Sequence, residues 1–237
     1  MKHTAKKRIA DYALLAITAL LILYFAIAQR QSFLKTLPTL VSLIVRLMLV
    51  RANRFAFLIG GTNALLYGLT QYSEGLYFSM ISSVIISMPL QYFTFFNWNK
   101  SRRSTGNTQL QIMTVPGRVA AAGATVALWL GCFFLLSDFF RGSLALLDSL
   151  AFALGLSVSV LAAFRYVESQ YLALLSETIA LIIWLNICLD DPSNLNYLII
   201  SCYNVFMAVK IAVGWTNQYL GKDECYECNA AASAAPC

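Results

Sequence analysis

Residues 79–100 form an apolar run whose final turns carry polar and aromatic side chains. On an α-helix, the spacing i, i+3, i+4 and i+7 places side chains on one face. In this run those positions are held by Gln91, Thr94, Phe95 and Trp98. Amides orient a ligand, and aromatic rings stack on planar heterocycles and attract cations. Inside a membrane, this stripe would be a candidate wall of a substrate site.

A carboxylate, Glu177, stands within another apolar run. It lies about eight residues, or roughly 12 Å, inside its predicted helix. At that depth a carboxylate stays neutral, pairs with a cation or faces a water-filled cavity. Trp184 follows seven residues later and shares the same helix face. Glu177 is therefore a candidate for a functional charge.

Two other predicted helices carry mixed polar and aromatic faces, with Asn63 and Tyr67 on one and Tyr203 on the other. Arg46 and Lys210 differ from these, because both lie within about five residues of predicted cytoplasmic helix ends, where their charges can reach water. The predicted substrate-binding residues are Asn63, Tyr67, Gln91, Thr94, Phe95, Trp98, Glu177, Trp184 and Tyr203.

Motifs of catalysis and metal binding are missing from the sequence. It contains no Gly-rich phosphate loop, no Walker-type lysine, and no His, Cys or carboxylate pair at metal-ligand spacing. Cys225 and Cys228 form half of a zinc-ribbon spacing without a second pair. We therefore predict no catalytic residues, no metal site and no cofactor, and we expect the protein not to be an enzyme. Without an ATPase motif, transport would be passive, ion-coupled or driven by a partner.

The composition indicates the elements that must position these residues. Hydrophobic residues make up 59% of the 237 residues and charged residues 12%, with a mean hydropathy of +0.67. Crossing a lipid bilayer takes about 20 mostly apolar residues per helix. The net charge of +6 comes from loop residues that set membrane orientation, so it does not predict nucleic-acid binding. Apolar runs occur at about 10–28, 34–50, 54–72, 76–96, 118–137, 143–163, 170–189 and 195–215. The sequence therefore predicts an all-α polytopic membrane protein with eight transmembrane helices in a lipid bilayer.

The first helix follows a basic segment at the amino terminus. Ala26-Ile27-Ala28 is similar to a signal-peptide cleavage site, but the apolar run is long for a signal peptide and further spans follow, so we expect the helix to be retained. Positive residues in alternate loops then place both termini in the cytoplasm.

A long polar segment, residues 99–117, divides the chain. The three predicted helices before it and the last three after it share loop features, and each third helix ends with Trp and Asn close together. Three spans are an odd number, so one inverting helix is needed before a second triplet can enter in the same direction. We therefore predict a 3+1+3 core of two parallel three-helix repeats behind an extra N-terminal helix, with eight unrelated helices as the alternative. The predicted units are 1–30 (N-terminal cytoplasmic segment and extra helix), 31–98 (first repeat), 99–117 (cytoplasmic loop), 118–140 (inverting linker helix), 141–220 (second repeat) and 221–237 (disordered cytoplasmic tail).

Several short segments between residues 34 and 220 occur in a characteristic order. They are Arg51-Ala52-Asn53-Arg54, Gly60-Gly61, Leu66-Tyr67, Gly75-Leu76-Tyr77, Phe93-Thr94-Phe95-Phe96-Asn97-Trp98, Leu147-Asp148-Ser149 and the run around Tyr203, Phe206 and Gly214. This order resembles the PnuC family of bacterial vitamin-precursor transporters, whose best-known members take up nicotinamide riboside. The family's usual Tyr-Gly-Trp-x-x-Trp keeps only its last Trp here, and its second Trp-x-x-Trp region is Tyr171-Leu172-Ala173-Leu174.

The resemblance implies a SWEET-like fold and facilitated diffusion of nicotinamide riboside across the bacterial inner membrane. It also implies a homotrimer and trapping of the cargo through phosphorylation by a cytoplasmic kinase. Relatives carry thiamine or riboflavin, so these are alternative cargoes. A buried Glu177 and aromatic faces favour a small cationic vitamin precursor, whereas neutral riboflavin gains nothing from the carboxylate. A membrane scaffold without a substrate is the alternative of another class.

Overall fold

The computed structural model describes residues 2–31, 33–73, 82–100, 110–140, 145–190 and 195–220. The tail predicted over 221–237 and residues 101–109 of the loop predicted over 99–117 lie outside the described residues. The elements in chain order are α1 (Lys2–Ala28), α2 (Phe33–Leu49), α3 (Phe55–Ser73), the π-helix η1 (Ser82–Ser87), α5 (Met88–Lys100), α6 (Val115–Phe140), α7 (Ala145–Ala163), α8 (Glu168–Asp190) and α9 (Leu195–Tyr219).

The predicted all-helical architecture is confirmed. Because η1 continues directly into α5, the described residues form eight helices. The β contact that they contain is an isolated parallel bridge between Gln111 and Tyr166. Helices satisfy their own backbone hydrogen bonds, which lipid cannot do for them.

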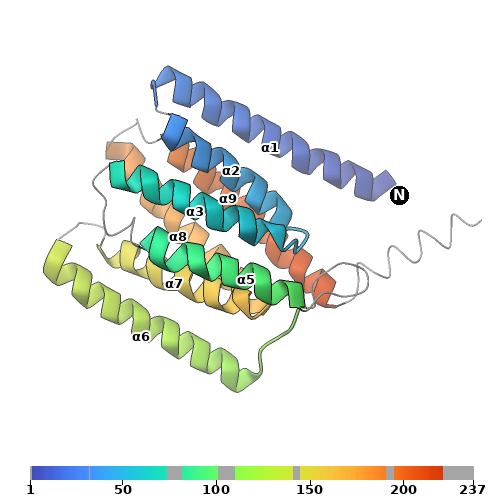
Figure 1. The fold of residues 1–237 in the computed structure, drawn as a ribbon, viewed down its shortest axis with the longest axis vertical. Helices are drawn as coiled ribbons and strands as arrows, with labels where there is room; N and C mark the ends of the chain where they lie inside the picture. Colours follow the sequence, from blue (N-terminus) through green and yellow to red (C-terminus); the bar gives the residue numbers. More distant parts are fainter. Residues whose placement is uncertain are drawn as a thin grey trace, which may run out of the picture.

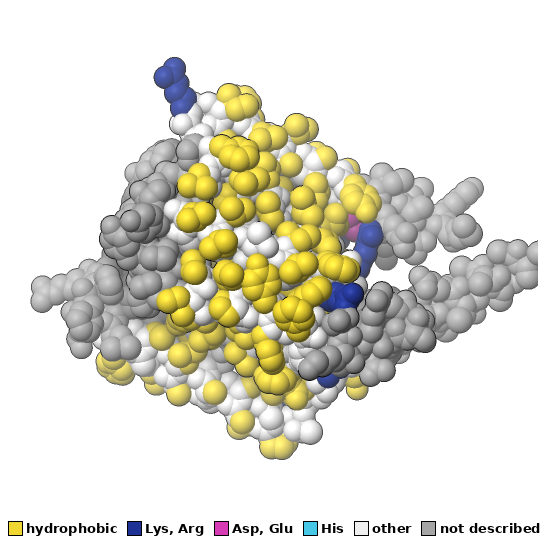
Figure 2. Space-filling model, viewed as in Figure 1, with side chains coloured by type: hydrophobic (Ala, Val, Ile, Leu, Met, Phe, Trp, Pro, Cys, Tyr) yellow, Lys and Arg dark blue, Asp and Glu magenta, His cyan; other side chains and the backbone are white. Residues whose placement is uncertain are grey.

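Long apolar helices cover much of the surface of the molecule. In the described part of the chain, four helical stretches are long and apolar enough to cross a membrane, and three shorter apolar helices accompany them. Figure 2 shows hydrophobic side chains over most of the visible face, with the visible Lys and Arg side chains toward its edges. The four long stretches are Ala10–Ala28, Val115–Phe134, Glu168–Leu189 and Leu195–Tyr219.

Six helices close into a ring (Figure 1). Around the ring, α2 contacts α3, α3 contacts η1 and α5, α5 contacts α7, α7 contacts α8, α8 contacts α9, and α9 returns to α2. The two remaining helices lie outside it, since α1 packs on α2 and α9, and α6 packs on α7. This arrangement leaves the inner faces of the six ring helices to surround a common centre.

The hairpin turns that join α2 to α3 and α7 to α8 have the same geometry. Ala52 and Arg165 both adopt a left-handed backbone, with φ of 47° and 66°. The Ala52 N–H donates to the Leu49 carbonyl and the Arg165 N–H donates to the Ala162 carbonyl, both at 2.9 Å. The following residue of each turn bonds five positions back, which completes a Schellman motif. The sequence separation between Ala52 and Arg165 is the same as that between Leu49 and Ala162, so the residues of the two turns correspond one to one.

Two tryptophans close the ring at the end that carries these hairpin turns. The Trp98 indole of α5 donates to the Ala162 carbonyl at the end of α7, and the Trp215 indole of α9 donates to the Leu49 carbonyl at the end of α2, both at 2.8 Å. Both tryptophans are fully buried, and their ring centroids lie 5.1 Å apart. The Trp98 indole thus joins α5 to α7, and the Trp215 indole joins α9 to α2.

Loss of either indole donor should destabilise the ring. We expect Trp98→Phe and Trp215→Phe each to lower the free energy of unfolding by about 0.5–1.5 kcal/mol, because each removes a buried indole hydrogen bond while the carbonyl keeps the N–H donor of its own turn. Thermal unfolding of the purified protein in detergent measures the loss. Trp129→Phe in α6 is the matched control, since the buried Trp129 Nε1 donates no hydrogen bond to the described residues. Equal losses for Trp129→Phe and the two ring variants would contradict this role.

Candidate functional site

A cavity of about 390 Å³ lies inside the ring, and all six ring helices and η1 contribute to its wall. Its polar lining consists of one cation, one anion, four amides and several hydroxyls. These side chains are Arg46, Glu177, Asn63, Gln91, Gln170, Asn204, Ser42, Tyr67, Ser83, Ser87, Thr94, Ser159 and Ser176. A wall of this kind suits a small ligand that carries charge and several hydrogen-bonding groups.

Five of the sequence-predicted residues line this cavity together: Asn63, Tyr67, Gln91, Thr94 and Glu177. They come from α3, α5 and α8, which are far apart in the sequence. The helical stripe on α5 therefore contributes its amide and its hydroxyl to the wall.

The structure places the other four predicted residues outside the cavity wall. Trp98 lies in the buried cluster at the hairpin end, and Tyr203 is buried and donates its hydroxyl to the Leu43 carbonyl at 3.3 Å. The Trp184 ring stacks on Tyr197 with centroids 4.4 Å apart. Phe95 lies under the Arg54 guanidinium, 5.3 Å from its ring centroid. Their predicted roles in binding a ligand would need a different arrangement of these side chains.

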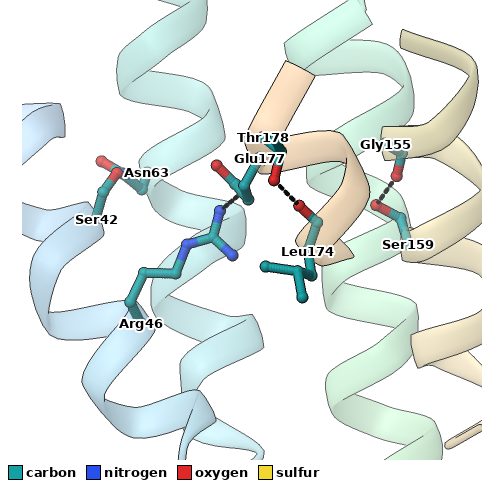
Figure 3. Close-up of polar contacts among 8 residues, drawn as sticks. All are labelled: Ser42, Arg46, Asn63, Gly155, Ser159, Leu174, Glu177 and Thr178. Atoms are coloured by element: carbon teal, nitrogen blue, oxygen red, sulfur yellow. Dashed lines mark hydrogen bonds and ion pairs between the residues drawn. The ribbon is translucent and has the colours of Figure 1, made fainter. Parts of the chain in front are cut away.

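The two charges of the cavity form an ion pair across it. Arg46 on α2 donates a hydrogen bond from Nη2 to Glu177 Oε1 on α8 (Figure 3). In the ring α9 lies between α2 and α8, so the pair bridges helices that are not ring neighbours. Their side chains are only 22% and 16% exposed. Glu177 is therefore neutralised within the protein, and Arg46 does not extend to water at a helix end as expected from the sequence.

Sequence reasoning missed Arg46 as a cavity residue, although a signal was present. One way to accommodate a carboxylate within an apolar run is to pair it with a cation, and Arg46 and Lys210 are basic residues well inside apolar runs. The structure resolves this choice, since Lys210 on α9 pairs with Asp11 on α1. Neither residue of that second pair lines the cavity.

Two amide oxygens in the wall have no partner among the described residues. Asn63 donates through Nδ2 to the Pro38 carbonyl at 3.1 Å and to Ser42 Oγ at 2.9 Å, but its Oδ1 is buried and accepts no hydrogen bond. The Oδ1 of Asn204 is likewise buried without a donor. Buried acceptors of this kind favour a ligand that supplies N–H or O–H groups.

A glycine positions the amide of Gln91 against α3. A Cβ atom added at Gly60 would lie 2.1 Å from Gln91 Oε1, so only glycine admits the side chain in this position. The wider π-helical turn of η1, which continues into α5, places Ser83 and Ser87 in the wall. Such turns are frequent at functional sites in helices.

The walls on the two sides of the cavity correspond to one another. Each residue of α7 or α8 that lines the cavity has a counterpart on α2 or α3 that lines it too. The sequence separation within each such pair is the one between Ala52 and Arg165 in the hairpin turns. Arg46 thus corresponds to Ser159, and Glu177 corresponds to Ala64. The positions that line the cavity recur at this separation, whereas its two charges do not.

Comparison with known proteins agrees with this architecture. A family model described as "Nicotinamide mononucleotide transporter" matches residues 32–217, which run from the start of the ring into its last helix. Among solved structures, the fold is similar to the "Crystal structure of the Vitamin B3 transporter PnuC", with a TM-score of 0.74. The two sequences are 17% identical, and the match covers 88% of this chain and 91% of that chain. No curated protein sequence matches the chain.

Removing one member of the ion pair should cost more stability than removing both. We expect Arg46→Gln and Glu177→Gln each to lose about 2 kcal/mol of unfolding free energy, because each leaves a largely buried charge without its partner. The double variant should unfold close to the wild type, as measured by thermal unfolding in detergent. A double variant less stable than both single variants would contradict the pairing.

Proposed function

The chain belongs to the nicotinamide mononucleotide transporter family, which is the PnuC family that the sequence resembles, and on this premise we propose that it carries nicotinamide riboside across a membrane by facilitated diffusion. The cavity within the ring is the proposed binding site. Uptake then becomes effective because a cytoplasmic kinase phosphorylates the cargo and traps it. The cargo, the passive mechanism and the kinase are proposals that the resemblance motivates.

The observation that carries the proposal is the match between the cavity wall and this cargo. Nicotinamide riboside combines a positive pyridinium ring, a carboxamide and ribose hydroxyls. Glu177 supplies a carboxylate for the ring, and the Oδ1 atoms of Asn63 and Asn204 accept hydrogen bonds from the carboxamide or the hydroxyls. Thiamine also carries a positive ring and is the closest alternative cargo.

We propose that the ring is built from two parallel repeats, α2–α3–α5 and α7–α8–α9, with α6 as the inverting linker. The matched hairpin turns, the reciprocal indole hydrogen bonds and the corresponding cavity walls support this 3+1+3 arrangement. Both termini and the hairpin turns then face the cytoplasm of a bacterium, and the protein resides in the inner membrane. A homotrimer is proposed from the resemblance alone.

Glu177 should determine the affinity for a cationic cargo. We expect Glu177→Gln to weaken binding of nicotinamide riboside at least tenfold, or by about 1.4 kcal/mol, because it removes the carboxylate and leaves the Arg46 cation unpaired in the cavity. Isothermal calorimetry on the purified protein measures this change. Glu168→Gln is the control, since Glu168 pairs with Arg118 outside the cavity. Unchanged affinity in Glu177→Gln would overturn the role of the carboxylate, and binding of thiamine alone would reassign the cargo.

The scaffold alternative predicts a different response to changes in the cavity wall. We expect Asn63→Ala and Gln91→Ala each to reduce uptake of labelled nicotinamide riboside into cells at least fivefold at equal expression, because each removes an amide from the wall. Thr178→Ala on α8 is the control, since Thr178 is exposed and bonds the Leu174 carbonyl within its own helix. Full uptake by both amide variants would favour a protein without this transport function.

A further inference from the structure

We propose that Arg46 is a surrogate for the positive charge of the cargo: its guanidinium pairs with Glu177 when the carrier is empty and gives up the carboxylate when a cationic ring binds. This inference rests on the proposed function, because it requires a cationic cargo. It adds a step in the transport cycle to the binding role of Glu177.

The composition of the cavity wall supports the exchange of one cation for another. Among the described residues that line the cavity, Arg46 is the one cation and Glu177 is the one anion. Their contact crosses the ring from α2 to α8, which come from different helix triplets. A cationic ring that approaches Glu177 from the cavity must therefore compete with the guanidinium for the same carboxylate.

A displaced guanidinium still finds hydrogen-bond acceptors in the cavity. Asn63 is bonded to Ser42, which lies one helical turn from Arg46 on the same helix, and the Asn63 Oδ1 accepts no hydrogen bond among the described residues. Asn204 on α9, the helix between α2 and α8, presents a second such oxygen. These two oxygens belong to the same wall as Arg46 and are the neutral acceptors for a guanidinium that leaves Glu177 (Figure 3 shows Asn63 and Ser42 on the two neighbouring helices α3 and α2).

The pair matters most when the empty carrier returns. A buried carboxylate without a counter-ion is costly. After a cationic cargo has left, the six helices therefore cannot readily close around an unpaired Glu177. Arg46 restores neutrality and permits closure of the empty cavity. Net uptake needs this return step, whereas exchange of cargo on one side for cargo on the other uses loaded carriers in both directions.

Proteoliposomes separate these two modes. Net uptake is measured as labelled nicotinamide riboside entering empty vesicles, and exchange as its entry into vesicles loaded with unlabelled nicotinamide riboside, both with the membrane potential clamped at zero. We expect Arg46→Gln to reduce the ratio of net uptake to exchange about tenfold or more. The same variant should bind nicotinamide riboside about tenfold more tightly, because the competing guanidinium is gone.

Three further variants make the test specific. Arg46→Lys keeps a cation and should keep most of the wild-type ratio. The double variant Arg46→Gln/Glu177→Gln has a neutral wall and should regain the wild-type ratio while binding nicotinamide riboside more weakly than Arg46→Gln does. Asp11→Asn/Lys210→Met removes the ion pair between α1 and α9, which lies outside the cavity wall, and should leave the ratio unchanged.

The outcomes distinguish this inference from the proposed function. Wild-type protein that moves nicotinamide riboside in neither mode would contradict the proposed function and, with it, the surrogate role. Wild-type protein that shows both modes, together with an unchanged ratio and unchanged affinity in Arg46→Gln, would overturn the surrogate role alone. A fall in the ratio that the double variant does not reverse would assign Arg46 a merely structural role.

Discussion

The structure depends on two reciprocal hydrogen bonds from indole donors to helix-end carbonyls. Trp98 ties α5 to the end of α7, and Trp215 ties α9 to the end of α2, while their rings pack against each other. Carbonyls at helix ends have no partner within the helix, and lipid offers none. The Leu49 and Ala162 carbonyls each accept from the N–H of their own turn and from one indole, so the tryptophans complete these helix ends and close a six-helix ring at the same positions.

Charge neutrality is the second constraint, and it explains why Arg46 and Glu177 occupy opposite walls. Neither charge is stable alone in a membrane interior, and each is largely removed from water. Their pairing joins α2 to α8, which are not neighbours in the ring. A polar cavity of this kind is thus compatible with a bilayer because its charges cancel.

Sequence reasoning predicted the helices and part of the wall for clear physical reasons. Apolar runs of membrane length specify helices, and helical spacing correctly placed Gln91 and Thr94 on one face that lines the cavity. The same spacing could not show that Trp98 lies beyond the end of the cavity. Trp98 is buried because other helices pack around it, and helical spacing within one helix does not reveal that packing. Nor could the depth of Glu177 identify its partner, since Arg46 lies on a helix that only the ring closure brings near. The π-helical turn of η1 likewise leaves no mark in residue spacing.

The two sides of the cavity wall differ in the size and charge of their side chains. The counterparts of Arg46 and Glu177 in the opposite halves are Ser159 and Ala64, which are small and also line the cavity. Each half of the wall thus carries one member of the charged pair, and a short side chain stands at the position that matches the other member. The ion pair therefore joins two halves that correspond in position but not in charge.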